Sequence, residues 1–360
     1  MPDPGKTPNQ ERALIDAAVA WLRERLPSGW QIERAGGDAD AQIAIRSPQS
    51  HTTIVVEAKR SVAPRDVAGW TSGLARSLRT VVPNVPVLVV APWLSARARE
   101  LLADAGLNYL DTTGNALLRL DHPAVFISSA GADRNPQPSE RPVASLRGPK
   151  AARLIRTLAD VRPPYGVSEL ASAAGLTAGY VSRLLERLDR EALVERGPRG
   201  VVLDVDVGAL LRAWAESYDV FRRELTTTWL APGGPRAALA ALADAPGRTA
   251  VTGSFAAVRL APVAAPSLLV AYCEHVEETA DALGLLPADT APNVVLLRPF
   301  DEVVWTRAQD EDGVAYAASS QVVVDCLTGD GRMPAEGEAL LTALMADDRW
   351  RAPDLAAATS

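Results

Sequence analysis

The sequence predicts an α/β protein of several domains, and three observations support this prediction. The chain has 360 residues, a length that suits two or three domains with separate hydrophobic cores. Helical and strand-like periodicities alternate towards both ends of the chain, as in mixed α/β folds. A polar, proline-rich stretch, GADRNPQPSERPVAS, covers residues 131–145 and is typical of a linker. We therefore expect an α/β domain over 1–130, a small central domain over 146–205 and a second α/β domain over 206–360.

The composition is that of a globular protein, with 48% hydrophobic residues, 22% charged residues and a net charge of −7. The two cysteines, Cys273 and Cys326, and the three histidines show no zinc-ligand spacing, so the cysteines are expected to be buried apolar residues. The first residues lack the apolar core of a signal peptide, and the longest apolar run, 260–273, contains two prolines. We expect a cytoplasmic protein that does not bind membranes.

The N-terminal domain is predicted to mix helices and strands. An amphipathic helix is expected over 8–26, with strands at 30–35, 41–46 and 52–58. A helix over 64–79, a buried parallel strand over 87–90 and a helix over 95–105 follow, and short strands fit 108–110, 115–120 and 124–128.

Two carboxylates and a lysine mark one end of these strands. Glu57 and Lys59 point to the same face because side chains alternate along a strand, and Asp40 directly precedes the neighbouring strand. This pattern resembles the PD-(D/E)xK nuclease fold. The resemblance implies that Asp40 and Glu57 hold Mg²⁺, which prefers oxygen ligands, and that Lys59 assists catalysis. The alternative is that Glu57 and Lys59 form an ordinary ion pair on one face of the strand.

A second polar segment, Asp111-Thr-Thr-Gly-Asn115, lies between two short predicted strands. It is a good hairpin turn, with Asp111 accepting from backbone N–H groups. A functional interpretation would instead place Asp111 and Asn115 near the strand end that carries Glu57.

The central domain is predicted to be a winged helix-turn-helix. A short helix over 168–174 ends at Gly175, and Thr177 can cap a second helix whose inward stripe consists of Val181, Leu184, Leu185 and Leu188. A helix over 150–161 precedes this pair, and residues 193–205 fit a two-stranded wing. A helical hairpin whose arginines are merely solvated is the alternative.

The polar side of this domain suits the groove of double-stranded DNA. The candidate contacts lie on the second helix and the wing: Thr177, Tyr180, Ser182, Arg183, Arg187, Arg196 and Arg199. Residues 141–200 carry 11 Lys and Arg against 6 Asp and Glu, an excess of +5 that leaves −12 for the rest of the chain. This segregation restricts the expected DNA contact to one module.

The C-terminal domain is predicted to begin with a long helix over 207–226 and to end with a helix over 335–346. Strands are expected around Val251 and at 268–272, 293–297 and 303–306. Thr252-Gly253-Ser254 after a strand resembles a nucleotidyltransferase fold, but no acidic residue follows over 259–272, so any such fold is expected to be inactive. The alternative is that this segment is an ordinary turn from a strand into a helix. Gln321 and Asp325 are four residues apart and so share one face of an expected helix, where they are candidates for contacts between domains.

Several blocks together resemble one family. They are VVEAK (55–59), GLNYLDTTGNALLRL (106–120), LRGPKAARLIRTLAD (146–160), the winged helix, AVTGSFAAVRLAP (250–262), NVVLLRPFDEVVW (293–305) and SSQVVVDCLTGDGRMPAEGEALL (319–341). They resemble actinobacterial proteins classed with the abortive-infection type IV (AbiEi) antitoxins. The resemblance implies a winged-helix regulator, with a nucleotidyltransferase toxin as a further partner. The usual antitoxin carries its winged helix at the N-terminus, whereas here a nuclease-like domain precedes it.

The function expected from the sequence is sequence-specific DNA binding by a transcriptional regulator, as a homodimer on double-stranded DNA. DNA binding requires no cofactor in this interpretation. The alternative is a Mg²⁺-dependent endonuclease that the winged helix targets to DNA. A third possibility is that the N-terminal domain only holds nucleic acid or mediates dimerisation.

Overall fold

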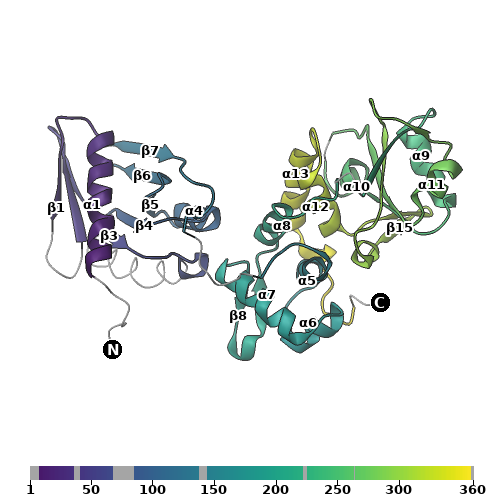
Figure 1. The fold of residues 1–360 in the computed structure, drawn as a ribbon, viewed down its shortest axis with the longest axis horizontal. Coiled ribbons are helices and arrows are strands. Elements are labelled where there is room, and N and C mark those ends of the chain that lie inside the picture. Colours follow the sequence, from purple (N-terminus) through teal and green to yellow (C-terminus); the bar gives the residue numbers. More distant parts are fainter. Residues whose placement is uncertain are drawn as a thin grey trace. The chain divides into compact units, whose positions relative to one another are not determined.

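The computed structural model describes residues 8–35, 41–67, 85–137, 144–221, 225–262 and 264–357 (Figure 1). The chain divides into two compact units, Met1–Pro142 with Arg190–Ala192, and Val143–Asp189 with Leu193–Ser360. Within the described ranges, no helix combines the length and apolar character needed to cross a bilayer.

The first unit is built on a seven-stranded sheet whose spatial order follows the chain. Its strands are β1 (Gln31–Ala35), β2 (Ala41–Arg46), β3 (His51–Ala58), β4 (Val87–Ala91), β5 (Asn108–Asp111), β6 (Ala116–Leu120) and β7 (Val125–Ser129). The three central strands β3, β4 and β5 are parallel, and the flanking pairs are antiparallel. The carboxyl ends of β3, β4 and β5 therefore meet at one edge of the sheet.

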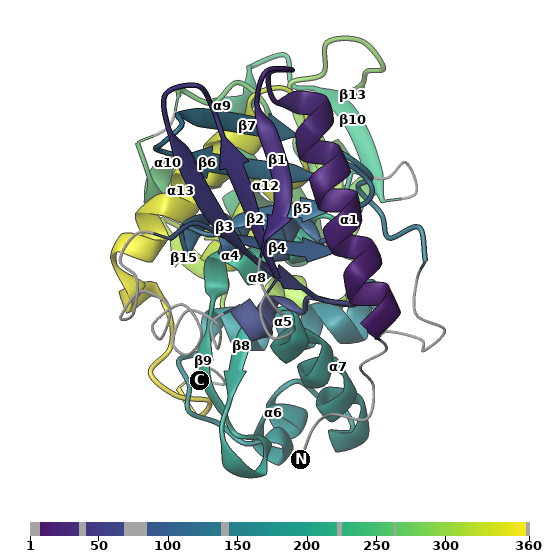
Figure 2. The same cartoon turned by 90° about the vertical axis from the view of Figure 1, so that its left-hand side faces the viewer.

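Helices cover both faces of this sheet, because its central strands are apolar on both sides. α1 (Pro8–Arg25) lies along one face (Figure 2), where Leu22 packs with Ile43 and Val90. α4 (Ala96–Asp104) belongs to a separate cluster with Leu94. The predicted elements of this unit are confirmed where they are described; residues 64–67 are helical, and the rest of the expected helix over 64–79 lies outside the described residues.

The second unit begins with the winged helix-turn-helix. Its elements are α5 (Pro149–Asp160), α6 (Val167–Ala173), α7 (Ala178–Arg190), β8 (Val194–Arg196), the short 3₁₀ turn η1 (Pro198–Gly200) and β9 (Val202–Val205). The four predicted inward residues of α7, Val181, Leu184, Leu185 and Leu188, are all fully buried, which confirms the predicted stripe.

The rest of the second unit is an α/β domain around a sheet of order β13-β10-β14-β12-β11-β16-β15. Its strands are β10 (Thr226–Leu230), β11 (Thr249–Thr252), β12 (Leu269–Cys273), β13 (Leu286–Pro287), β14 (Val294–Leu297), β15 (Gln309–Glu311) and β16 (Val314–Tyr316). Its helices are α8 (Val207–Ala215), α9 (Pro235–Ala241), η2 (Leu242–Asp244), α10 (Gly253–Leu260), α11 (Val276–Ala282), η3 (Glu302–Trp305), α12 (Ser319–Thr328), α13 (Met333–Ala346) and η4 (Asp348–Trp350). Both cysteines are unpaired and fully buried, as expected.

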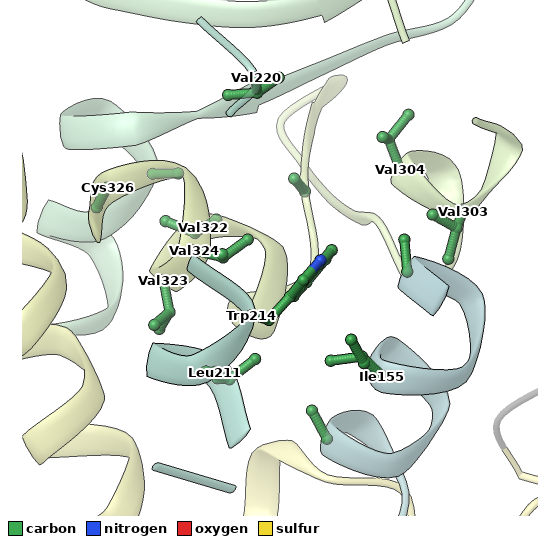
Figure 3. Packing of buried hydrophobic residues seen from close by; sticks show 14 of the residues in the cluster. Ile155, Leu211, Trp214, Val220, Val303, Val304, Val322, Val323, Val324 and Cys326 are labelled. Atoms are coloured by element: carbon green, nitrogen blue, oxygen red, sulfur yellow. The ribbon is translucent and has the colours of Figure 1, made fainter. Parts of the chain in front are cut away.

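The winged helix and the C-terminal sheet share one hydrophobic core. Trp214 of α8 is 1% exposed and lies between Ile155 of α5 and the valines of α12 (Figure 3). Burying an indole of this size on both sides excludes water from the junction and stabilises it by several kcal/mol, roughly 3–5 by the cost of truncation to alanine. The winged helix-turn-helix is therefore packed firmly onto the domain that follows it.

Two predictions for this unit are wrong. The helix expected over 207–226 ends at Ala215, because Tyr218 turns inward and its ring contacts Trp214 and Phe300. The strand expected over 303–306 is the 3₁₀ turn η3, where the Asp301 carboxylate accepts from the Val303 N–H at 3.0 Å. In both places a tertiary contact or a cap outweighs local propensity.

Candidate nucleic-acid interface

The turn between α6 and α7 sets the position of the second helix. Gly175 adopts φ +63°, a left-handed conformation that non-glycine residues adopt only at a cost, and ends α6. Thr177 then caps α7, since its Oγ1 accepts from the Tyr180 N–H at 3.4 Å and its carbonyl accepts from the Val181 N–H at 3.1 Å. The predicted cap is therefore present.

The outward side of α7 carries small and basic side chains. Ser182 and Arg183 are exposed, and Tyr180 is half-buried beside them. Burial raises the pKa of the Tyr180 phenol, and the neighbouring Arg183 opposes this rise, so the hydroxyl remains a neutral donor. Glu186 is exposed on the same helix, so an acidic side chain follows Ser182 and Arg183 on this surface.

The wing is a three-stranded arrangement. β8 pairs antiparallel with β9, and Tyr165 forms an isolated bridge to Val202 on the other side. Burial raises the pKa of Tyr165, and its hydroxyl donates to the Leu158 carbonyl, which fastens the strand to α5. Arg199 stands exposed at the tip with φ +59°. The wing therefore presents one arginine that is clear of its own backbone.

Two of the predicted DNA contacts have internal roles as well. Arg187 donates to the Ala144 carbonyl at 2.5 Å and so holds the chain that leads into α5. Arg196 lies across the wing backbone, because a Cβ on Gly200 would come within 2.6 Å of its Nη2. These guanidiniums are half-buried, in contrast to the exposed Arg183 and Arg199.

Fewer cations of the winged helix-turn-helix are available to DNA than its sequence indicates. Arg153 makes a bidentate pair with Asp301, both contacts being 2.8 Å, and Arg162 pairs with Asp348 at 3.0 Å. Asp301 raises the pKa of Arg153 further, through hydrogen bonds and charge. Arg153 lies in α5 and Arg162 follows it, and both side chains bind the C-terminal domain. The positive charge that remains available to DNA therefore lies on α7 and the wing.

A buried polar network at the same junction was not predicted as a whole. Arg156, 1% exposed, donates to Asp160, to the Gln321 side chain at 2.9 Å, and to the carbonyls of Val303 and Thr306. Asp160 also accepts from Ser320. The contact expected for Gln321 is therefore present, and it joins the winged helix to α12.

The network continues into the core of the C-terminal domain. Gln321 donates to Asp325, which also accepts from the hydroxyls of Tyr218, Tyr272 and Thr252. Burial is the main cause that raises the pKa of Asp325 to about 6, although these hydrogen bonds oppose it. Desolvation likewise raises the pKa of both tyrosines, so each hydroxyl stays a donor.

The expected nucleotidyltransferase-like segment is also used internally. Ser254 at the start of α10 donates to Glu336 of α13, and Thr252 is committed to Asp325. These polar atoms tie helices to the sheet, and a specific nucleotidyltransferase fold is not established by them.

The nuclease-like residues of the first unit are only partly described. Glu57 and Lys59 form an ion pair at the carboxyl end of β3, with side chains 25% and 34% exposed, and Asp40 lies outside the described residues. Across the described ranges, no group of three histidine, cysteine, aspartate or glutamate side chains is arranged to hold a metal. The described residues therefore offer Mg²⁺ one carboxylate, and the fit of the ion depends on Asp40.

Asp111 serves the turn. Its carboxylate accepts from the N–H of Leu94 and from the backbone and side chains of Thr113 and Asn115, at 2.7 to 3.1 Å. Asn115 in turn accepts from Arg99 and from the Gly131 N–H. With its lone pairs occupied and 1% of its surface exposed, Asp111 is a structural cap, as the turn interpretation predicted.

Comparison with known proteins supports the DNA-binding assignment. Residues 149–198 match the family model of the IclR helix-turn-helix domain, so the chain contains an IclR-type helix-turn-helix DNA-binding domain there. A solved structure of EndoMS in apo form is 23% identical over 31% of this chain and 47% of its own chain, with a TM-score of 0.20. The match thus spans less than half of EndoMS and is too weak to indicate a shared fold or activity. No curated protein matches the chain.

Proposed function

We propose that the protein is a sequence-specific transcriptional regulator that reads double-stranded DNA with α7. The observation that carries this proposal is the exposed Ser182 and Arg183 face at the start of a capped helix, within an IclR-type helix-turn-helix. α7 has 13 residues, about 20 Å, which is enough to lie in a major groove about 12 Å wide.

Within this proposal the seven predicted residues divide into three roles. Thr177, Tyr180, Ser182 and Arg183 face the groove, where a guanidinium can bind guanine or phosphate. Arg199 contacts the backbone from the wing tip. Arg187 and Arg196 position the entry to α5 and the wing and add long-range attraction. Binding as a homodimer to a two-fold operator follows from the way such helices are paired on DNA.

The test is DNA binding by full-length Arg183→Ala and Arg199→Ala, measured by fluorescence polarisation over a salt series on promoter and unrelated duplexes. Each variant should bind more weakly, and each lost phosphate contact should reduce the salt slope by about 1. Arg298→Ala is the matched control, because Arg298 pairs with Glu277 on the exposed surface of the C-terminal domain. Unchanged affinity and slope in both α7 and wing variants would show that another surface binds DNA.

A Mg²⁺-dependent endonuclease is the second proposal, favoured by the Glu57–Lys59 pair at the edge where three parallel strands end. Cleavage of duplex DNA with Mg²⁺ should disappear in Asp40→Asn, Glu57→Gln and Lys59→Ala alike. Activity that persists in all three variants would be contamination, and the N-terminal unit would then hold nucleic acid or mediate dimerisation. The antitoxin role is a further proposal, tested by copurification with a nucleotidyltransferase encoded next to this protein.

A further inference from the structure

A cavity of about 290 Å³ lies at the junction of the winged helix and the C-terminal domain. Its walls come from α5, from the turn after α6 including Gly175, and from η3 with the residues that follow it. Its volume is near the lower end, about 300 Å³, of sites that bind small molecules. Figure 3 shows Val303 of η3 facing the helix that carries Ile155, which places this wall beside the core. The cavity thus touches both the DNA-reading module and its neighbour.

Two guanidiniums that line this cavity retain hydrogen-bond donors. Arg153 uses Nε and Nη2 for Asp301, and its Nη1 lies towards the turn, 3.8 Å from where a Cβ on Gly175 would be. Arg307 uses Nη2 for the Trp350 carbonyl at 3.0 Å. Within the described ranges, neither the Nη1 of Arg153 nor the Nε and Nη1 of Arg307 meets an acceptor. Both cations therefore offer donors to a further molecule.

The acidic side chains that line the cavity are already paired. Asp160 accepts from Arg156 and Ser320, and Glu302 accepts from Arg248 at 2.9 Å. Asp160 is thus matched by Arg156, whereas Glu302 shares Arg248 with Glu274, and its charge also acts on Arg153. Among the described residues, the hydrogen-bond donors that remain unused in the cavity belong to Arg153 and Arg307, and Val161, Val303 and Leu355 give it an apolar wall. Planar guanidinium edges match carboxylate and phosphate oxygens best.

We propose that this cavity binds a small dianionic metabolite, with carboxylate or phosphate groups at the arginines and a short apolar body against the wall. Arg153 lines the cavity, lies near Gly175 of the helix-turn-helix turn and pairs with Asp301, the cap of η3, so an occupant that engages its Nη1 acts directly beside the turn between α6 and α7. Occupancy then changes DNA affinity, and DNA changes ligand affinity by the same factor. The regulatory half of this inference rests on the proposed function, whereas the binding half does not.

Titration calorimetry of the full chain with succinate and with inorganic phosphate tests the binding half. At least one probe should bind wild type at millimolar or lower concentration, and Arg307→Gln and Arg153→Gln should each weaken it tenfold or more. Arg298→Gln, the exposed control in the same unit, should bind like wild type. Arg307→Gln is the decisive variant, because it removes no ion pair among the described contacts.

Failure of both probes to bind, or equal binding by wild type and Arg307→Gln, overturns the site. The regulatory half is tested by repeating the polarisation assay with the bound probe. The probe should shift the DNA dissociation constant of wild type several-fold. The dissociation constant of Arg307→Gln should be the same with and without the probe. If a probe binds and DNA affinity stays unchanged, the regulatory half is wrong and the binding site stands. If the wild-type protein binds no DNA with or without the probe, the proposed function alone is wrong.

Discussion

Replacing Arg156 with alanine should be one of the most destabilising single changes in the second unit. The side chain is 1% exposed and makes contacts with Asp160, Gln321 and two backbone carbonyls. Its removal leaves Asp160, 3% exposed, as a buried carboxylate whose remaining described partner is Ser320. Breaking one side of a buried ion pair costs roughly 3–5 kcal/mol, because the other charge is left without compensation.

That cost is a large fraction of the roughly 5–15 kcal/mol by which a typical domain is stable. Equilibrium urea unfolding of the full chain, followed by tryptophan fluorescence, should show the midpoint of Arg156→Ala falling steeply. The midpoint of Arg156→Lys should lie between those of wild type and Arg156→Ala. Lysine keeps the positive charge but lacks the planar guanidinium that reaches four acceptors. Asp160→Asn tests the same reasoning from the other side of the pair.

The control is Arg298→Ala, which breaks an exposed pair with Glu277 and should change stability by less than about 1 kcal/mol. A loss below about 1 kcal/mol in Arg156→Ala would refute the reasoning. It would mean that the junction relaxes to let water reach Asp160, and that the winged helix is joined to the C-terminal domain by its apolar core alone.

Further predictions concern the turn, the network and the first unit. Gly175→Ala should cost about 1–2 kcal/mol in urea unfolding because φ is +63°, whereas Gly179→Ala in α7 should be neutral or stabilising by up to about 1 kcal/mol. Because burial raises the pKa of Asp325 from 3.8 to about 6, the folded state binds its proton more tightly than the unfolded state. The free energy of unfolding should therefore fall by about 2–3 kcal/mol as pH rises from about 4 to 6, and it should stay at the lower value above about pH 6. Asp325→Asn should abolish this pH dependence in thermal unfolding measured over a pH series. Asp111→Asn, which puts donors against donors, should cost about 1–3 kcal/mol in thermal unfolding, and the exposed Asp104→Asn should cost little.

Local signals explain which parts of the fold were predictable. The winged helix follows from short-range features: an apolar stripe at helical spacing, Gly175 at a turn that needs positive φ, and a capping threonine. The strands of the first unit follow from apolar runs bounded by polar turns. Each of these signals lies within about a dozen residues, so the sequence displays it directly.

The junction could not be predicted because its contacts join distant segments. Arg156 and Gln321 are 165 residues apart, and Tyr218 reaches Asp325 across 107 residues. The spacing of Gln321 and Asp325 predicts their shared helix face, yet no nearby sequence feature identifies Arg156 and Tyr218 as their partners. The same long-range contacts explain the error at 207–226, where the inward turn of Tyr218 ends a helix that propensity alone would continue.

The shared core also limits how regulation can reach DNA. A winged helix on a flexible linker could respond to a signal by moving as a separate body. Here α5 packs against α8 and α12, and its arginines are used to bind Asp301 and the Arg156 network, so the module cannot turn without breaking buried contacts. A signal in the C-terminal domain therefore has to act by small shifts of α5 and the α6–α7 turn, not by release of the module. Arg153, which contacts Asp301 on one side and approaches Gly175 on the other, is the side chain best placed to transmit such a shift.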